Sequence, residues 1–197
     1  MKNIFDIFKK FLIVVFIIFL MSNISSAEPL RVVHLPTIVV PGLEIERDIV
    51  DQVEVKISRA LFIPAIENFQ GVEYIPSSQS KNAMRNIFNN MQGSNTKSKL
   101  LRSMKPLAQN LNADFVVCAI IYQYEQKYFG SNLQSEAAID MIIFDNRTDE
   151  LINKNVEKNY NDLYKSLGTA DSLLIECVTN LIDELQIKNR LMNHNLN

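Results

Sequence analysis

Three consecutive strand-like segments in the second half of the chain limit its fold more than any other feature. These segments are rich in apolar and β-branched residues and cover 115–124, 137–144 and 150–158. The sequences between them, at 130–132 and 145–149, contain Gly, Asn, Asp and Thr, which favour tight turns. Strand-like segments joined by such short turns are typical of hairpins. The pattern predicts an antiparallel meander.

The rest of the chain combines two further strand patterns with helical ones. Residues 31–40 are apolar on both faces, which is typical of a central strand, and 72–75 form a short second strand pattern. From Glu46 apolar residues recur one helical turn apart, and Pro64 is expected to limit that helix. Further helices are predicted from 77 or 78 to 93, from about 97 to 111 and from about 169 to 187.

The predicted element order is β-α-β-α-α-β-β-β-α. It favours an α/β (α+β) fold in which helices pack on a single mixed sheet of about five strands that ends in an antiparallel meander. The length suits one domain, which we place at 28–187. Residues 188–197 are polar and are predicted to form a disordered tail with nothing to bury.

The first 27 residues have the organisation of an export signal. Lys9 and Lys10 precede an unbroken apolar run at 11–21, and small residues follow up to Ala27. A bilayer-spanning helix needs about 20 apolar residues, more than this run provides. We predict a signal peptide, 1–27, that is cleaved after Ala27, and a periplasmic or extracellular protein. An uncleaved inner-membrane anchor is the alternative.

Charge and cysteine positions narrow the range of partners. Removing 1–27 takes three lysines and one aspartate from totals of 20 basic and 22 acidic residues, which leaves a formal charge of −4. Such a surface argues against nucleic acid or anionic lipid as the main partner. The basic cluster Lys97, Lys99, Arg102 and Lys105 is interpreted as a solvated helix face. Since neither cysteine follows the leader, membrane association is expected only through an uncleaved leader or a partner.

The sequence lacks the common signatures of catalysis and cofactor binding. Its five glycines are too scattered for a phosphate-binding loop, and its two histidines form no metal-ligand pair. A Gly-x-Ser-x-Gly motif is also absent. We therefore predict no cofactor, no metal site and no enzymatic activity. The alternative is a small exported hydrolase with an unrecognised site.

Three polar features of the sequence are candidate sites. Cys118 lies in an apolar strand pattern and is interpreted as a small buried hydrophobe, although His34 in a neighbouring strand is a conceivable base for its thiol. Cys118 and Cys177 are either two buried thiols or a disulfide. Asp140, alone among apolar residues, is expected to point outward from the sheet rather than act as a general base.

An aromatic group marks the first turn of the meander. It consists of Tyr122, Tyr124, Tyr128 and Phe129. Tyrosines at alternate strand positions are expected to share one face of the sheet. If they are exposed they form a patch that binds a partner, and if a helix covers them they belong to the core. Both readings remain open from the sequence.

Three segments resemble bacterial envelope domains typified by the TolB amino-terminal domain and the curli-secretion lipoprotein. They are RVVHLPTIVV at 31–40, LAQNLNADFVVCAII at 107–121 and IDMIIFDNRTDELINKNVEK at 139–158. The resemblance implies an anticodon-binding-like α/β domain without cofactor, working in the periplasm or at the outer membrane through protein contacts. This chain departs from those families in lacking a lipid-bearing cysteine and in placing Asp149 where glycine is usual.

These observations lead to one hypothesis of function and two alternatives. The hypothesis is an exported, non-enzymatic envelope protein that binds another envelope protein or assembles with itself. The hydrolase is the first alternative, and the second is a structural homo-oligomer joined at a sheet edge or through the meander tyrosines.

Overall fold

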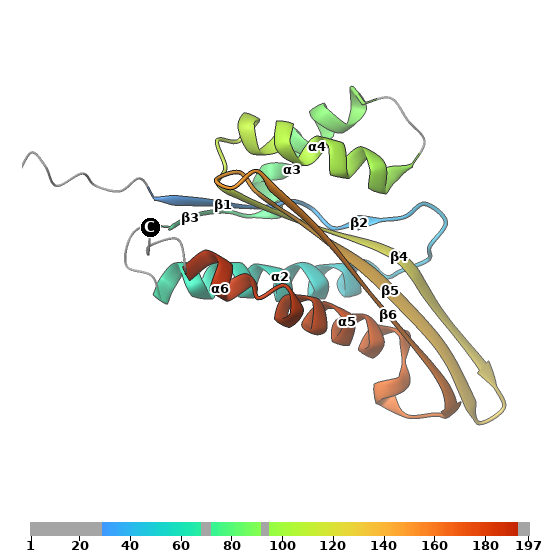
Figure 1. The fold of residues 1–197 in the computed structure, drawn as a ribbon. Coiled ribbons are helices and arrows are strands. Elements are labelled where there is room, and N and C mark those ends of the chain that lie inside the picture. Colours follow the sequence, from blue (N-terminus) through green and yellow to red (C-terminus); the bar gives the residue numbers. More distant parts are fainter. Residues whose placement is uncertain (1–28, 68–71, 92–94, 193–197) are drawn as a thin grey trace, which may run out of the picture.

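A computed structural model describes residues 29–67, 72–91 and 95–192. One mixed sheet separates two layers of helices (Figure 1). The strands are β1 (Leu30–His34), β2 (Ile38–Val39), β3 (Val72–Ile75), β4 (Phe115–Phe129), β5 (Asn132–Asp145) and β6 (Glu150–Leu163). The helices are α2 (Arg47–Glu67), α3 (Ser77–Asn89), α4 (Thr96–Asn110), the 3₁₀ turn η1 (Ser166–Gly168), α5 (Ala170–Glu184) and α6 (Ile187–Met192).

The sheet has the order β3-β1-β4-β5-β6, with β2 paired to β4 beyond the end of β1. β1 is parallel to both β3 and β4, while β4, β5 and β6 form antiparallel pairs. The predicted fold class and the meander are therefore confirmed. The leader at 1–27 lies outside the described residues.

The predicted strand at 31–40 is divided in two. β1 ends at His34 and β2 begins at Ile38, with Pro36 between them. Proline has no N–H to donate to the neighbouring strand, which explains the interruption. The backbone stays close to β4 across the gap, because Leu35 N–H donates to the Val117 carbonyl at 2.8 Å.

Two predicted helix boundaries are wrong. α2 continues past Pro64 to Glu67, so only the last few residues of the helix follow the proline, where little of the helix remains to be disrupted. The expected disordered tail also begins too early, because α6 extends to Met192 and Leu191 is buried. Ile187 and Leu191 are buried against the core, although the segment around them is polar on average, and this average led to the prediction of a disordered tail. Residues 193–197 lie outside the described residues.

Each face of the sheet packs its own hydrophobic cluster. α2, α5 and α6 cover one face, and α3 and α4 cover the other (Figure 1). β4 serves both clusters by alternation: Phe115 and Val117 face α2 and α5, whereas Val116 and Cys118 face α3 and α4. Both faces of a central strand are then buried, as its apolar sequence predicts. No helix within the described residues is long and apolar enough to cross a membrane.

The meander strands are longer than predicted and project beyond the helices (Figure 1). β4 continues to Phe129 and β6 to Leu163, through polar residues that gave no apolar signal. We call this outer part, residues 123–138 and 157–164, the arm. It forms a three-stranded ribbon held by continuous cross-strand pairing.

Candidate functional site

Asp140 borders a cavity of about 540 Å³ between the beginning of α4 and the sheet. The walls are partly apolar and partly polar. They consist of Val40, Pro41, Asn95, Thr96, Lys97, Ile120, Tyr122, Asp140 and Asn155. Asn95 is the N-cap of α4 and accepts a hydrogen bond from the backbone N–H of Ser98, which fixes the start of the helix beside the cavity.

Asp140 points outward from the sheet, as expected, but α4 covers that face and the carboxylate is buried. It is 3% exposed, and its Oδ2 lies 2.6 Å from Nζ of Lys97. Its Oδ1 accepts a hydrogen bond from Asn155 at 3.1 Å, and Asn155 also donates to the Tyr122 hydroxyl. Strand alternation places Asp140 on the face covered by α4, where Lys97 neutralises it. Lys97, whose side chain stays 39% exposed, is therefore paired with Asp140 and is not simply solvated.

The chemistry available in this cavity is limited. Burial, assisted by the negative charge of Asp140, raises the pKa of Tyr122 to about 12, so its hydroxyl stays neutral at physiological pH. Asp140 is held in an ion pair, and none of the described residues lining the cavity is a serine, cysteine or histidine. The described residues also contain no cluster of three or more His, Cys, Asp or Glu that could hold a metal ion.

His34 and Cys118 lie on opposite faces of the sheet and do not form a dyad. His34 faces α2, where its Nδ1 is 3.1 Å from the Ser58 hydroxyl and 3.3 Å from that of Tyr74. Cys118 faces the α3 and α4 layer and donates to the Pro36 carbonyl. Burial lowers the pKa of His34 to about 4 and raises the pKa of the Cys118 thiol, so neither is activated at neutral pH.

Cys118 and Cys177 are two buried free thiols. Cys177 belongs to α5 and to the cluster on the α2 and α5 face, while Cys118 belongs to the cluster on the other face. The sheet therefore separates the pair proposed as a disulfide. Burial raises the pKa of Cys177 to about 11, which keeps this thiol protonated and unreactive.

The aromatic group is divided by a β-bulge in β4. The pairing with β5 shifts between Ile121 and Gln123, and this shift reverses which face the following residues occupy. Tyr122 consequently lines the cavity, while Tyr124 turns to the other face and donates its hydroxyl to Asp171 in α5. The expected common face of the two tyrosines is thus wrong, because an extra residue breaks the alternation.

Tyr128 and Phe129 lie at the end of the arm and are 58% and 61% exposed. Leu163 and Tyr164 join them from the end of β6, with 57% and 55% exposure, and the rings of Tyr128 and Tyr164 are 6.3 Å apart. We call these four residues the arm tip. Sequence reasoning missed Leu163 and Tyr164 because the polar residues before them led us to end the strand at residue 158.

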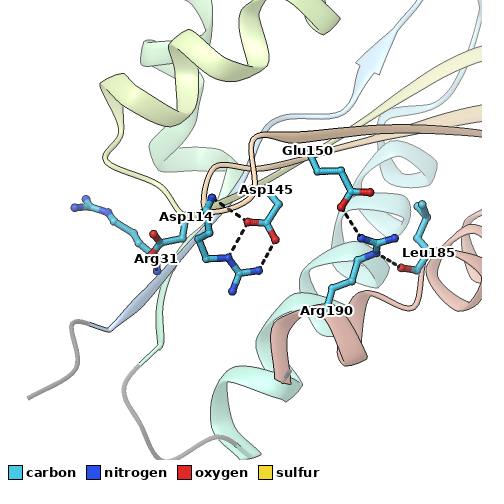
Figure 2. A network of polar contacts seen from close by, with 7 residues as sticks. Arg31, Asp114, Asp145, Glu150, Leu185 and Arg190 are labelled. Carbon is cyan, nitrogen blue, oxygen red and sulfur yellow. Dashed lines mark hydrogen bonds and ion pairs between the residues drawn. The ribbon is translucent and has the colours of Figure 1, made fainter. Parts of the chain in front are cut away.

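The opposite end of the meander is closed by a polar network (Figure 2). Asp145 accepts hydrogen bonds from the Arg147 backbone at 3.1 Å and from its guanidinium, including Nε at 2.7 Å. Asp114 accepts from the backbone N–H of Arg31 at 2.8 Å, which ties β1 to the entry of β4. Arg190 in α6 reaches Glu150 at 3.2 Å. These contacts join the turn after β5 to the body of the protein.

Comparison with solved structures finds matches at low sequence identity and low TM-score. No family model matches this sequence, and no curated protein matches it. The lipoprotein GNA1162 from Neisseria meningitidis is 14% identical, with a TM-score of 0.42 over 79% of this chain and 99% of its own. The hypothetical protein CT253 from Chlamydia trachomatis is 14% identical, with a TM-score of 0.44 over 84% and 99%. A PelC dodecamer from Paraburkholderia phytofirmans is 11% identical, with a TM-score of 0.41 over 79% and 90%.

Proposed function

We propose that this is an exported, non-enzymatic protein that works by joining protein chains at the open strand edges of its arm. The added strand comes from a second copy of the chain or from another envelope protein. The observation that carries the proposal is the arm itself, a ribbon whose two outer strands have unpaired edges. An open edge presents a row of backbone donors and acceptors that can pair with another chain.

Both edges are open within the described residues. β6 pairs with β5 along its 14 residues and with no other described strand. β4 pairs only with β5 from Gln123 onward, because β2 reaches no further than Ile121. The arm therefore offers a long edge on β6 and a shorter one on β4.

The β6 edge also lacks two features that usually prevent strand addition, proline and a β-bulge. It contains no proline, and no bulge interrupts its pairing with β5. Its lysines are directed to α5: Lys158 lies 2.5 Å from Glu176, and Lys154 lies 3.8 Å from Glu184. Charges that are engaged over the sheet face are less effective in repelling a strand that approaches from the edge.

The alternative of a hydrolase finds less support. The cavity beside Asp140 brings a buried carboxylate to open volume, yet Lys97 neutralises it, and the described residues that line the walls include no nucleophile with a positioned base. A protein that acts by contact needs neither group.

A proline at Asn159 tests the edge directly. Tyr164 donates its N–H to Ser131 on the β5 side, and N–H directions alternate along a strand, so the N–H of Asn159 points to the open edge. Asn159→Pro removes that outward donor without removing a bond to β5. Asn159→Ala keeps the donor and is the matched control.

The measurement is light scattering during size-exclusion chromatography over a range of protein concentrations. We expect the natural protein and Asn159→Ala to form oligomers and Asn159→Pro to remain a monomer with native circular dichroism. Oligomers of Asn159→Pro equal to those of the natural protein would contradict assembly at this edge.

Amino-terminal sequencing tests the export prediction, with Glu28 as the expected first residue.

A further inference from the structure

The arm tip is apolar on both faces of the ribbon. Phe129 pairs with Asn132, which in turn pairs with Leu163, so Phe129 and Leu163 flank one another across β5 on the same face. Tyr128 lies on the other face, where its ring approaches that of Tyr164. Each of the four side chains remains more than half exposed despite these contacts.

This distribution suits a partner that surrounds the end of the ribbon. A protein docked on one face would leave the apolar side chains of the other face in water. The four side chains together expose on the order of 400 Å². A stable protein interface buries about 800 Å² on each partner, so the tip alone is too small to hold a second copy of the chain.

We propose that the arm tip inserts end-on into the interfacial layer of a lipid bilayer. Tyrosine is enriched at that depth because its ring is apolar and its hydroxyl remains hydrated. Interfacial apolar groups reach about 5–10 Å into the headgroup region, which corresponds to two or three residues of an extended strand. That depth matches the two residues that each outer strand contributes to the tip.

The charges near the arm tip are balanced, so insertion does not require anionic lipid and a zwitterionic bilayer is sufficient. Lys127 is paired with Glu125 at 2.9 Å. Exposed Lys165 is three positions from exposed Asp162, so no net charge gathers at the end of the arm. Insertion is therefore driven by apolar burial rather than by attraction to anionic headgroups. This route to a membrane requires neither a retained leader nor a protein partner, and it uses side chains distinct from the strand edges of the proposed function.

The chain contains no tryptophan, which permits a local fluorescent reporter. Phe129→Trp places the reporter at the arm tip. Leu151→Trp is the matched control, since Leu151 is an exposed leucine, 44% exposed, at the other end of β6. The protein is purified from cells that export it and mixed with phosphatidylcholine vesicles whose acyl chains are brominated. Because the readout is local, any leader retained in the membrane does not imitate insertion of the tip.

We expect the emission of Phe129→Trp to shift to the blue and to be quenched by about half on adding vesicles, with little change in about 0.5 M NaCl. The Leu151→Trp emission should stay unchanged. Adding Leu163→Ser and Tyr164→Ser to Phe129→Trp should weaken vesicle partition by about tenfold or more.

Three results would overturn the proposal. The first is unchanged Phe129→Trp emission in a protein with native circular dichroism. The second is equal quenching of both reporters, which indicates non-specific adsorption. The third is a blue shift without vesicles that grows with protein concentration, which assigns the tip to a second copy of the chain.

Discussion

The two ends of the meander formed by β4, β5 and β6 are stabilised in opposite ways. At the body end, the turn after Asp145 is closed by Arg147 and connected to α6 through Glu150 and Arg190 (Figure 2). At the far end, the arm tip presents four side chains that are more than half exposed. One end gains stability from ion pairs and hydrogen bonds, while the other leaves apolar side chains exposed.

The body and the arm differ in how far helices cover the sheet. Helices cover both faces of the sheet in the body, so side chains there are committed to the core. In the arm, cover comes from η1 and the first half of α5: η1 lies against Tyr160, Glu176 pairs with Lys158, and Tyr124 bonds Asp171. Beyond those contacts the ribbon is free to meet another molecule, which is expected of a binding element carried on a rigid scaffold.

The largest expected effect on stability comes from removing the contact between Asp145 and Arg147 at the body end. Asp145→Ala leaves the partly buried Arg147 guanidinium without its carboxylate and removes three hydrogen bonds. We expect the free energy of unfolding to fall by about 3 kcal/mol, measured by urea denaturation. Asp162→Ala, the same change beside the tip, should cost less than about 0.5 kcal/mol. Equal losses would remove the contrast between the two ends.

Acid should destabilise the body through His34. Burial lowers the pKa of His34 from 6.5 to about 4, so between these values the unfolded chain binds a proton that the folded protein excludes. The contribution of His34 to stability is complete above pH 6.5 and is lost as the pH falls toward 4, a loss of about 3 kcal/mol. Subtracting the profile of His34→Gln isolates this effect from that of the carboxylates. A difference profile that stays flat from pH 7 to about 4 would contradict it.

A smaller effect is expected where the arm meets the body. A Cβ added to Gly168 would lie 2.5–2.7 Å from ring atoms of Tyr160 in β6. Gly168→Ala must displace that ring and should cost about 2 kcal/mol. In combination with Tyr160→Ala the two losses should be less than additive, since the second change removes the obstacle. Additive losses in urea denaturation would show that η1 does not rest on Tyr160.

The buried parts of the strands could be predicted from the sequence, whereas their exposed parts could not. The apolar runs of β4 and β5 predicted the meander, because burial is encoded directly by residue type. The outer halves of the strands were missed because solvated strand residues such as Gln126 and Asn159 carry no apolar signal. Where these residues are exposed, as in β4 at 125–129, cross-strand pairing rather than burial holds the strand extended.

The candidate sites were harder to predict for a different reason. A one-residue bulge after Ile121 places Tyr122 and Tyr124 on opposite faces of the sheet, and no residue type at this point of the sequence indicates a bulge. The burial of Asp140 could not be predicted without knowing that α4 covers its face of the sheet. The ion pair with Lys97 joins residues 43 positions apart in the sequence. At Asp149 the departure from glycine does not change the turn. Asp149 adopts the left-handed conformation, with φ of +55°, and aspartate tolerates this conformation in turns.

The smallest effect is expected at the arm tip, where side chains are available for binding and contribute little to the fold. Leu163→Ser removes an apolar side chain that is 57% exposed, so the free energy of unfolding should change by no more than about 0.5 kcal/mol. Leu133→Ser changes the same residue type one strand away, where the side chain is fully buried, and should cost about 3 kcal/mol. If Leu163→Ser proved as costly as Leu133→Ser in urea denaturation, the tip would be part of the core, and its exposed area would no longer indicate a binding surface.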